Sequence, residues 1–408
     1  MTNIKVEVYP ALEGDCFLIC IGDRKKTNIL VDGGFASTYH NYLKPRLLEM
    51  AENGEELSLV IVTHVDADHI EGIIELFKEN GTAENPLIIP IKEVWHNSYR
   101  HLNFLKQKSV EELDVKEESI LSGIISKSYV EPSKSRNNPN KGVSARDGST
   151  LAALLYKEKY SWNNAFNGSA VNLNERNFIS LTSEISLNLL SPDSNKLKRL
   201  EKFWLTELRK SKYDFKLNDN ILFDDAYEFY LLSQKDEHQV NESKNISYQK
   251  EKTSLNSVLN KKMIYDNSVV NGSSISFILE YKDYKLLFLA DSHPDIVREN
   301  IQGLVDTQGY IPFFDVIKVA HHGSHRNTST ELLSLIDSSV YLFSTNGKKN
   351  NHPNNETIAR IISRKGTERR LIFNYFIENE LLANEDLKKE YRFIVEFSDE
   401  FEIKVIEI

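Results

Sequence analysis

Four side chains that can bind a metal ion occur within six residues, in the segment His64-Val65-Asp66-Ala67-Asp68-His69. Imidazole and carboxylate groups are common protein ligands of divalent ions. The preceding residues 57–62 are apolar and rich in β-branched side chains, which predicts a buried strand, and a helix is expected from about residue 70. A loop carried on a rigid sheet can hold several such groups at one point. Because helix capping needs only one of them, the cluster predicts a metal site.

Three other segments of the chain, one before and two after this cluster, also consist of an apolar run followed by polar residues. They end in Asp32, Asp291 and the adjacent pair His321-His322. Taken alone, Asp32 could simply start an Asp-Gly turn, and Asp291 could cap a helix. Two adjacent histidines at the end of an apolar strand seldom serve packing alone. His352 lies in a turn-forming segment and would by itself be unremarkable as an exposed loop residue.

Together these motifs resemble those of the metallo-β-lactamase-fold hydrolases in type and order. Thr63-His64-x-Asp66-x-Asp68-His69 resembles their His-x-His-x-Asp-His signature, with Asp66 where most members have a second His. The Asp variant and the opening hairpin with Gly14-Asp15-Cys16 are most similar to the hydrolase domain of the competence DNA-uptake channel proteins. The resemblance implies an α/β protein, a metallo-β-lactamase-like αββα sandwich with a largely helical insertion.

The resemblance also implies a ligand set with one firm and one weak metal position. Most family members have a further His on the strand before the bridging Asp, but residues 271–280 contain none. The weak position would be formed by His64 and Asp66, and the firm position by Asp68, His69, Asp291 and one of His321 or His322. We assign His321 to the metal. A carboxylate in place of imidazole shifts the preference toward harder ions, so the expected cofactor is zinc or manganese.

The expected activity is hydrolysis by a metal-activated hydroxide, which needs no side-chain nucleophile. The candidate catalytic residues are Asp68, His322 and His352, and the candidate substrate contacts are Ser324 and Arg326. By the family resemblance, the leading substrate is a phosphodiester in a nucleic acid or nucleotide. The same hydroxide would open a lactone, thioester or β-lactam. A catalytically weakened scaffold that binds a partner is a third alternative, supported by the missing ligand.

The motifs divide the chain of 408 residues into three parts. Residues 1–96 and 266–408 carry the two halves of the predicted core and site. Residues 97–265 are predicted to be insertions that form an accessory lobe, with a returning core strand near residues 185–191. This lobe would restrict the substrate, or would mediate contact with a protein partner or a second copy of the chain.

Composition is typical of a cytoplasmic enzyme. No segment approaches the ~20 apolar residues of a membrane helix, and the N-terminus begins as a strand rather than a signal peptide. Cys16 and Cys20 lie on one extended strand, too far apart for a disulfide, as suits a reducing compartment. The formal net charge of −10 argues against general coating of nucleic acid. Nucleic-acid binding would therefore depend on local basic groups such as Lys348 and Lys349.

Overall fold

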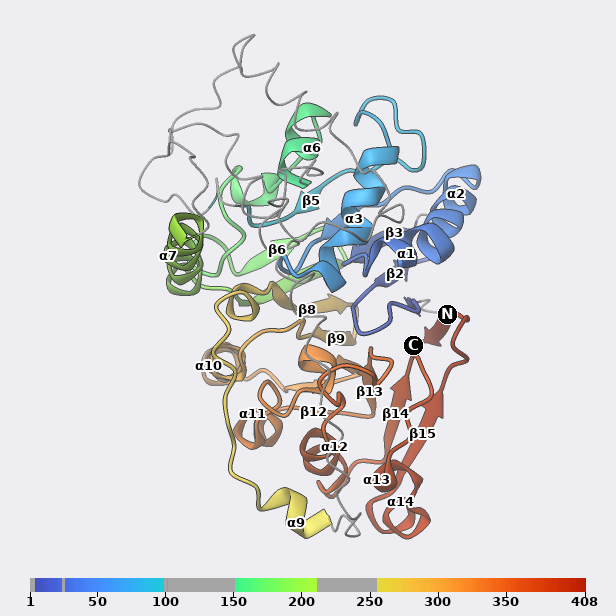
Figure 1. Cartoon of the computed structure of the whole chain (residues 1–408), viewed down its shortest axis with the longest axis vertical. Coiled ribbons are helices and arrows are strands. Elements are labelled where there is room, and N and C mark those ends of the chain that lie inside the picture. Colours follow the sequence, from blue (N-terminus) through green and yellow to red (C-terminus); the bar gives the residue numbers. More distant parts are fainter. Residues whose placement is uncertain (1–3, 24–25, 99–100, 102–150, 211–254) are drawn as a thin grey trace, which may run out of the picture.

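The computed structural model describes residues 4–23, 26–98, 101, 151–210 and 255–408, with the backbone alone for residues 204–210. Within these residues the strands form two large sheets that lie against each other (Figure 1). The first sheet has the order β16-β1-β2-β3-β4-β5, and its strands are β1 (Ile4–Val8), β2 (Phe17–Ile21), β3 (Thr27–Val31), β4 (Leu59–Ile61), β5 (Val94–Trp95) and β16 (Lys404–Glu407).

The second sheet has the order β15-β14-β13-β11-β9-β8-β7-β6. Its strands are β6 (Phe178–Ser180), β7 (Ile185–Ser191), β8 (Ser276–Tyr281), β9 (Tyr284–Phe288), β11 (Val316–Lys318), β13 (Val340–Phe343), β14 (Arg369–Phe373) and β15 (Phe393–Phe397). A short parallel pair, β10 (Phe313–Phe314) and β12 (Asp337–Ser338), lies beside it. The two ends of the described chain are adjacent, since the Ile408 backbone N–H donates to the Ile4 carbonyl at 3.0 Å.

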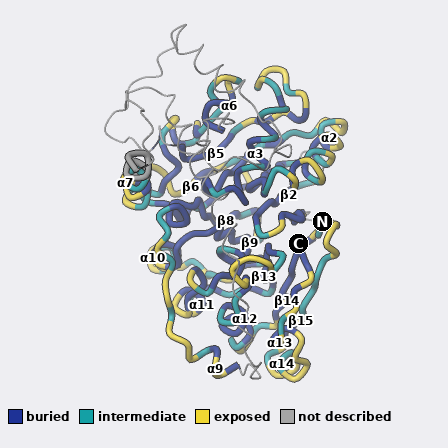
Figure 2. Tube along the Cα trace, in the orientation of Figure 1, coloured by how far each residue is buried: buried dark blue, intermediate teal, exposed yellow. Residues whose placement is uncertain are grey.

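Apolar side chains from both sheets fill the space between them. Val6 and Phe17 come from the first sheet, and Leu187 and Phe277 come from the second. Phe17 packs edge to face against Phe288, with 5.7 Å between the ring centroids. Burial of this apolar surface is the main force that holds the two sheets together. Figure 2 shows the consequence, because the buried segments run through the middle of the molecule and the exposed ones lie at its periphery.

Helices cover the outer face of each sheet and bury one apolar side against it (Figure 1). Helices of the first half are α1 (Ala36–Thr38), the π-helix η1 (Tyr39–Leu43), α2 (Lys44–Glu52), α3 (Ala67–Glu79), α6 (Leu151–Lys157), η2 (Asn164–Phe166) and α7 (Ser194–Lys210). Those of the second half are α9 (Leu255–Leu259), η4 (Asn271–Ser273), α10 (Pro294–Gln308), η5 (Ala320–Gly323), α11 (Thr330–Leu335), α12 (Asn355–Ile362), α13 (Glu380–Ala383) and α14 (Glu385–Tyr391).

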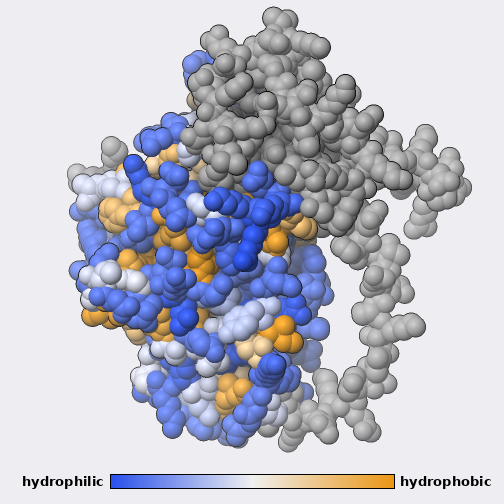
Figure 3. All heavy atoms as spheres, turned by 90° about the vertical axis from the view of Figure 1, so that its left-hand side faces the viewer, coloured by the Kyte–Doolittle hydropathy of each residue, from blue (hydrophilic) through white to orange (hydrophobic). Residues whose placement is uncertain are grey.

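This arrangement of helix, sheet, sheet and helix confirms the predicted α/β sandwich. The predicted insertion lies partly outside the described residues, which exclude 102–150 and 211–254. Its described part supplies α6, α7 and the strands β6 and β7, and β7 pairs with β8 at the core. On the face in Figure 3, hydrophobic residues occur in small groups among hydrophilic ones. Among the described residues no helix has the length and apolar character that a bilayer crossing requires.

Candidate metal centre

The polar groups predicted to bind metal follow the carboxyl ends of neighbouring parallel strands. β3 and β4 are parallel in the first sheet, and β9, β11 and β13 are parallel in the second. The carboxyl ends of parallel strands lie at the same edge of a sheet, so the loops that follow them are neighbours. These loops carry Asp32, the segment 64–69, Asp291, the pair His321-His322, and His352.

Close backbone packing fixes the segment 64–69. The His69 backbone N–H donates to the Asp66 carbonyl at 2.9 Å, and the His69 carbonyl accepts from the Gly33 N–H at 2.8 Å. Helix α3 comes so near to the loop after β3 that a Cβ on Gly72 would lie 2.0 Å from the Gly33 carbonyl oxygen. Glycine at position 72 therefore permits the approach that places His69 in the centre.

Three imidazoles and a carboxylate direct buried atoms toward one another. Asp291 Oδ2 lies 3.8 Å from His64 Nε2 and 3.8 Å from His322 Nε2, and Asp291 Oδ1 lies 3.7 Å from His69 Nε2. His322 Nε2 also lies 3.6 Å from Asp68 Oδ2. The three Nε2 atoms and Asp291 Oδ1 are buried and have no hydrogen-bond partner.

These atoms fit divalent metal ions. A buried polar atom without a hydrogen bond costs ~1–3 kcal/mol, so several at one point require an explanation. The ligand atoms of His64, His69 and Asp291 all lie within 4.8 Å of one another, as do those of Asp68, His69 and His322. Nitrogen and oxygen donors at such separations are suited to divalent metal ions. The donor set therefore supports a centre of one or two divalent ions.

One carboxylate sets the proton positions of two of the imidazoles. Asp32 accepts hydrogen bonds from the Thr63 backbone N–H at 2.8 Å, the Thr63 hydroxyl at 2.7 Å and His69 Nδ1 at 2.8 Å. Since the Thr63 proton is used on Asp32, Thr63 Oγ1 is left to accept from His64 Nδ1 at 3.0 Å. Both histidines are then protonated at Nδ1, and their Nε2 lone pairs face the centre, as metal ligation requires.

The charges of the centre compensate one another. Burial by itself would raise the pKa of Asp291, but His321, His322 and His69 hold that pKa well below its usual value. Burial by itself would lower the pKa of His69, but the carboxylates of Asp291 and Asp32 raise it to about 10. A metal ion would take over the positive charge of the imidazolium groups, because a ligating imidazole is neutral.

Asp15 and Lys318 form a buried ion pair directly behind two of the imidazoles. The His322 Nδ1 atom lies 3.0 Å from the Ser344 carbonyl oxygen and 3.4 Å from Asp15 Oδ1, and His69 Nδ1 lies 4.0 Å from Asp15 Oδ2. This pair was not predicted from the sequence, although Asp15 lies in the opening motif Gly14-Asp15-Cys16. The sequence contained one indication of a buried ion pair, because Lys318 ends an otherwise apolar strand.

His321 lies at the same centre but in different surroundings. Its Nε2 atom lies 3.5 Å from Asp291 Oδ2, and 22% of its side chain is exposed, against 4% for His322. On its other side, His321 Nδ1 lies 3.0 Å from Asn327 Oδ1 and 3.7 Å from Asp266 Oδ2. Neither Asn327 nor Asp266 was predicted from the sequence.

The remaining predicted residues surround the centre at greater distance or exposure. Asp66 Oδ2 lies 3.6 Å from His64 Nε2, and 32% of the Asp66 side chain is exposed. The ring centroid of His352 lies 5.2 Å from that of His321. Burial, together with the neighbouring histidines, lowers the pKa of His352 to about 3.

The two predicted substrate contacts differ in accessibility. Ser324 is buried, and its hydroxyl oxygen accepts from the Arg326 backbone N–H at 3.3 Å. Arg326 is exposed. The turn that carries them is held near His352 by Gly323, whose φ is +88° and whose added Cβ would lie 2.5 Å from Pro353 Cβ. A larger residue at position 323 would therefore separate the two loops.

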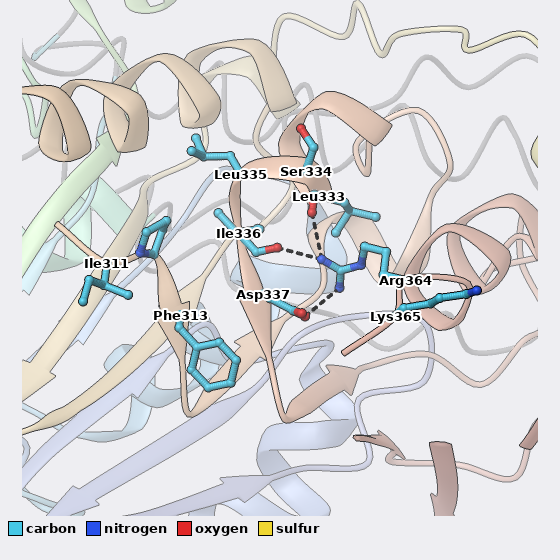
Figure 4. Close-up of a pocket in the computed structure, with 10 residues that line it drawn as sticks. Ile311, Phe313, Leu333, Ser334, Leu335, Ile336, Asp337, Arg364 and Lys365 are labelled. Carbon is cyan, nitrogen blue, oxygen red and sulfur yellow. Dashed lines mark hydrogen bonds and ion pairs between the residues drawn. The ribbon is translucent and has the colours of Figure 1, made fainter. Parts of the chain in front are cut away.

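A pocket of about 340 Å³ lies elsewhere (Figure 4). Its lining includes Ile311, Phe313 and Asp337, which precede β11 and β13, whereas the metal centre follows the carboxyl ends of these strands. Arg364 closes one wall by donating to the Ile336 carbonyl at 2.7 Å and pairing with Asp337 at 3.0 Å. This pocket is therefore separate from the predicted site.

The first part of the chain is similar to a known protein family. Residues 9–122 match the Metallo-beta-lactamase superfamily domain, and this segment contains Asp15, Asp32 and the cluster 64–69. A solved structure, the metallo-beta-lactamase fold protein YhfI from Bacillus subtilis, aligns over 100% of both chains with 13% sequence identity and a TM-score of 0.35. No curated protein matches this chain. Members of the superfamily are mostly metal-dependent hydrolases, and the match together with the donor set indicates that class.

Proposed function

We propose that this protein is a metal-dependent phosphodiesterase, acting on nucleic acid or a nucleotide. The main support for a hydrolase is that four buried side chains face one another at one point, namely His64, His69, His322 and Asp291. The Nε2 atoms of the three histidines and Oδ1 of the aspartate have no hydrogen-bond partner. When bound, divalent ions supply a hydroxide nucleophile near neutral pH and offset the negative charge that develops on the substrate. Zinc and manganese are both compatible with these donors.

The carboxylates favour phosphoryl over carbonyl chemistry. Asp66, Asp68 and Asp291 supply three carboxylate groups, and oxygen-rich sites suit the harder cations that pair with phosphate oxygens. The resemblance of the Asp66 variant to the hydrolase domain of competence DNA-uptake channel proteins supports the same substrate class.

Each residue of the site then has a distinct role. His64, Asp66, Asp68, His69, Asp291 and His322 hold the metal ions. The geometry favours His322 over His321 at the position beside Asp68, because His322 Nε2 is buried, lacks a hydrogen-bond partner and lies 3.6 Å from Asp68 Oδ2. Asp68 orients the attacking water as well as binding metal. His352, Ser324 and Arg326 contact the oxygens of the substrate.

Local basic groups are available for a polynucleotide despite the acidic chain. Lys348 is 74% exposed and lies 3.8 Å from Glu400, and Lys349 is 46% exposed and lies 3.5 Å from Glu13. Exposed ion pairs of this kind contribute little energy, so a phosphate can displace the glutamates. Both lysines precede the proposed substrate contact His352 in the same loop, which supports a role for them in binding a polynucleotide.

Hydrolysis of a small substrate panel tests the proposal. Protein stripped with a chelator and reloaded with Mn²⁺ or Zn²⁺ should cleave bis(4-nitrophenyl) phosphate, and Asp68→Ala should abolish the cleavage. His325→Ala is a matched control, because His325 lies in the same loop region but its Nδ1 contacts Asn354 at 2.9 Å rather than the centre. Turnover of a lactone or thioester without phosphodiester cleavage would favour a carbonyl hydrolase. Metal binding without any turnover would favour a partner-binding scaffold.

A further inference from the structure

The segment that lacks the expected histidine contacts a histidine from another loop. Residues 271–280 contain no imidazole, but the Asn271 side chain at the start of this segment lies against His321, with 3.4 Å between Asn271 Nδ2 and His321 Nδ1. His321 belongs to the loop after β11, next to His322. An imidazole is therefore present near the ligand-poor position, although it comes from a different part of the chain.

The reactive side of His321 faces the same carboxylate oxygen as His64. His321 Nε2 lies 3.5 Å from Asp291 Oδ2, and His64 Nε2 lies 3.8 Å from that oxygen. Ligand atoms about 2.0–2.2 Å from a shared ion are separated from one another by distances of this size. His64 Nε2 also lies 3.6 Å from Asp66 Oδ2.

The opposite side of His321 is held by hydrogen-bond acceptors. The shortest contact of Nδ1 is with Asn327 Oδ1 at 3.0 Å, so Nδ1 carries the proton and Nε2 keeps its lone pair. Asn327 cannot turn its amide over, because its Nδ2 group donates to Asp266 Oδ2 at 3.0 Å and to the Asp291 carbonyl at 3.0 Å. Metal-ligating histidines have this arrangement, in which the second ring nitrogen donates to a fixed oxygen.

Asp266 anchors the whole group. Its Oδ2 atom accepts from Asn271 Nδ2 at 2.7 Å and from Asn327 Nδ2 at 3.0 Å, and lies 3.7 Å from His321 Nδ1. Its side chain is 8% exposed. A buried carboxylate with amide partners behind an imidazole holds the ring in one orientation and increases its basicity as a ligand.

We propose that His321 is a ligand of the first metal position, together with His64, Asp66 and Asp291, and replaces the imidazole that residues 271–280 lack. His322 then serves the second position with Asp68 and His69, so both adjacent histidines bind metal. Asp266 and Asn327 are positioning residues for His321. The inference rests on the proposed metal centre, but it does not depend on the substrate.

Metal stoichiometry and affinity test this assignment without an activity assay. The full chain is stripped of metal and titrated with Mn²⁺, with binding followed by calorimetry and by electron paramagnetic resonance, which distinguishes a coupled ion pair from a single ion. Wild type is expected to bind two ions with different affinities. His321→Ala should lose the weaker ion and the coupled signal while it retains the tighter ion. Asp266→Asn should weaken the same ion by about 10–100-fold.

His325→Ala and His322→Ala provide the comparisons. His325→Ala should bind both ions as wild type does, and His322→Ala should weaken the tighter ion. Circular dichroism and thermal unfolding establish that each variant is folded; if His321→Ala is unfolded, the Asp266→Asn titration decides the question.

Four results separate this inference from the proposed function. Two ions bound by folded His321→Ala with unchanged affinities would overturn the assignment, as would a wild type that binds a single ion at saturating Mn²⁺. A wild type that binds no ion would overturn the metal-dependent function as well. Two ions with the expected variant effects but no phosphodiester cleavage would support the assignment of His321 and reject only the proposed substrate.

Discussion

Replacement of Asp32 by Asn tests whether one carboxylate controls two of the proposed metal-ligating imidazoles. Asp32 Oδ2 accepts from the Thr63 hydroxyl at 2.7 Å and from His69 Nδ1 at 2.8 Å. An Asn side chain has almost the same size, but it replaces one accepting oxygen with a donating NH₂ group. If Oδ1 of the Asn continues to accept from the Thr63 backbone N–H, the NH₂ group faces His69. The His69 proton must then move to Nε2, the atom that faces Asp291.

The same substitution affects His64 through Thr63. The Thr63 hydroxyl, which lies 3.0 Å from His64 Nδ1 in the native protein, would accept from the Asn NH₂ group and donate to His64 Nδ1. His64 would then also be protonated at Nε2. Loss of the partner that orients one metal ligand lowers metal affinity by about 10–100-fold. With two ligands affected, we expect Asp32→Asn to lower metal affinity by about 10²–10⁴-fold, or roughly 2.7–5.5 kcal/mol.

Competition with a chelator of known affinity measures this loss for Mn²⁺ and Zn²⁺. Thr63→Val is the matched comparison, because it removes the link to His64 and leaves the contact between Asp32 and His69, so its loss should be about 10–100-fold. Thr63→Ser keeps the hydroxyl and should bind metal as wild type does. Wild-type affinity in folded Asp32→Asn would refute the proposed proton positions.

Three further predictions address packing, stability and substrate. Gly72→Ala should destabilise the fold by about 1–3 kcal/mol, measured by thermal unfolding, and should weaken metal binding, measured by titration. Gly303→Ala is the control and should have neither effect, because its added Cβ would meet nothing within 4 Å. Burial by itself would raise the pKa of Asp337, but the neighbouring arginines lower it. The ionised Asp337 carboxylate therefore stabilises the fold fully above the ordinary pKa of Asp, and this stabilisation is lost as the pH falls through the lowered pKa. Asp337→Asn should therefore cost about 3 kcal/mol at neutral pH in urea unfolding, and the difference from wild type should shrink below about pH 4; a constant difference would contradict this. Charge reversal at Lys348 and Lys349 should weaken DNA binding, and the slope of log affinity against log salt concentration should become shallower by ~0.9 per lost phosphate contact. Cleavage of bis(4-nitrophenyl) phosphate should be reduced less than cleavage of DNA. Equal losses of cleavage on both substrates would argue for a role of these lysines in folding.

Local sequence patterns predicted the parts of the site that depend on neighbouring residues. An apolar, β-branched run ending in Thr63 predicted the strand β4, and the polar groups after it lie where the strand meets α3. The same reasoning placed Asp291 and His321-His322 after the strands β9 and β11. The prediction that these groups meet came from the resemblance of the motifs to the metallo-β-lactamase-fold hydrolases, and in the structure parallel strands bring the loops to one edge of a sheet.

Contacts between distant segments could not be predicted in this way. Asp15 and Lys318 pair across the two sheets, and nothing in either local sequence specifies the other. Asp266 and Asn327 are common loop residues, and their role depends on the direction of the His321 ring. The choice between His321 and His322 was also open, because adjacent residues on a turn can point to opposite sides. Both have left-handed backbone angles, φ 46° and 55°, which the sequence did not indicate.

The pair of Asp15 and Lys318 shows how the acidic centre can exist before metal binds. Buried ion pairs are weak contributors to stability, since removing two charges from water offsets much of their attraction. Both side chains are at most 2% exposed, so stability alone explains the pair poorly. However, Asp32 and Asp291 are buried nearby, and Lys318 holds the pKa of Asp15 well below its usual value despite burial. Lys318 thereby keeps Asp15 ionised behind the imidazoles of His69 and His322, where the carboxylate favours their Nδ1–H forms and directs their Nε2 lone pairs toward the proposed metal centre.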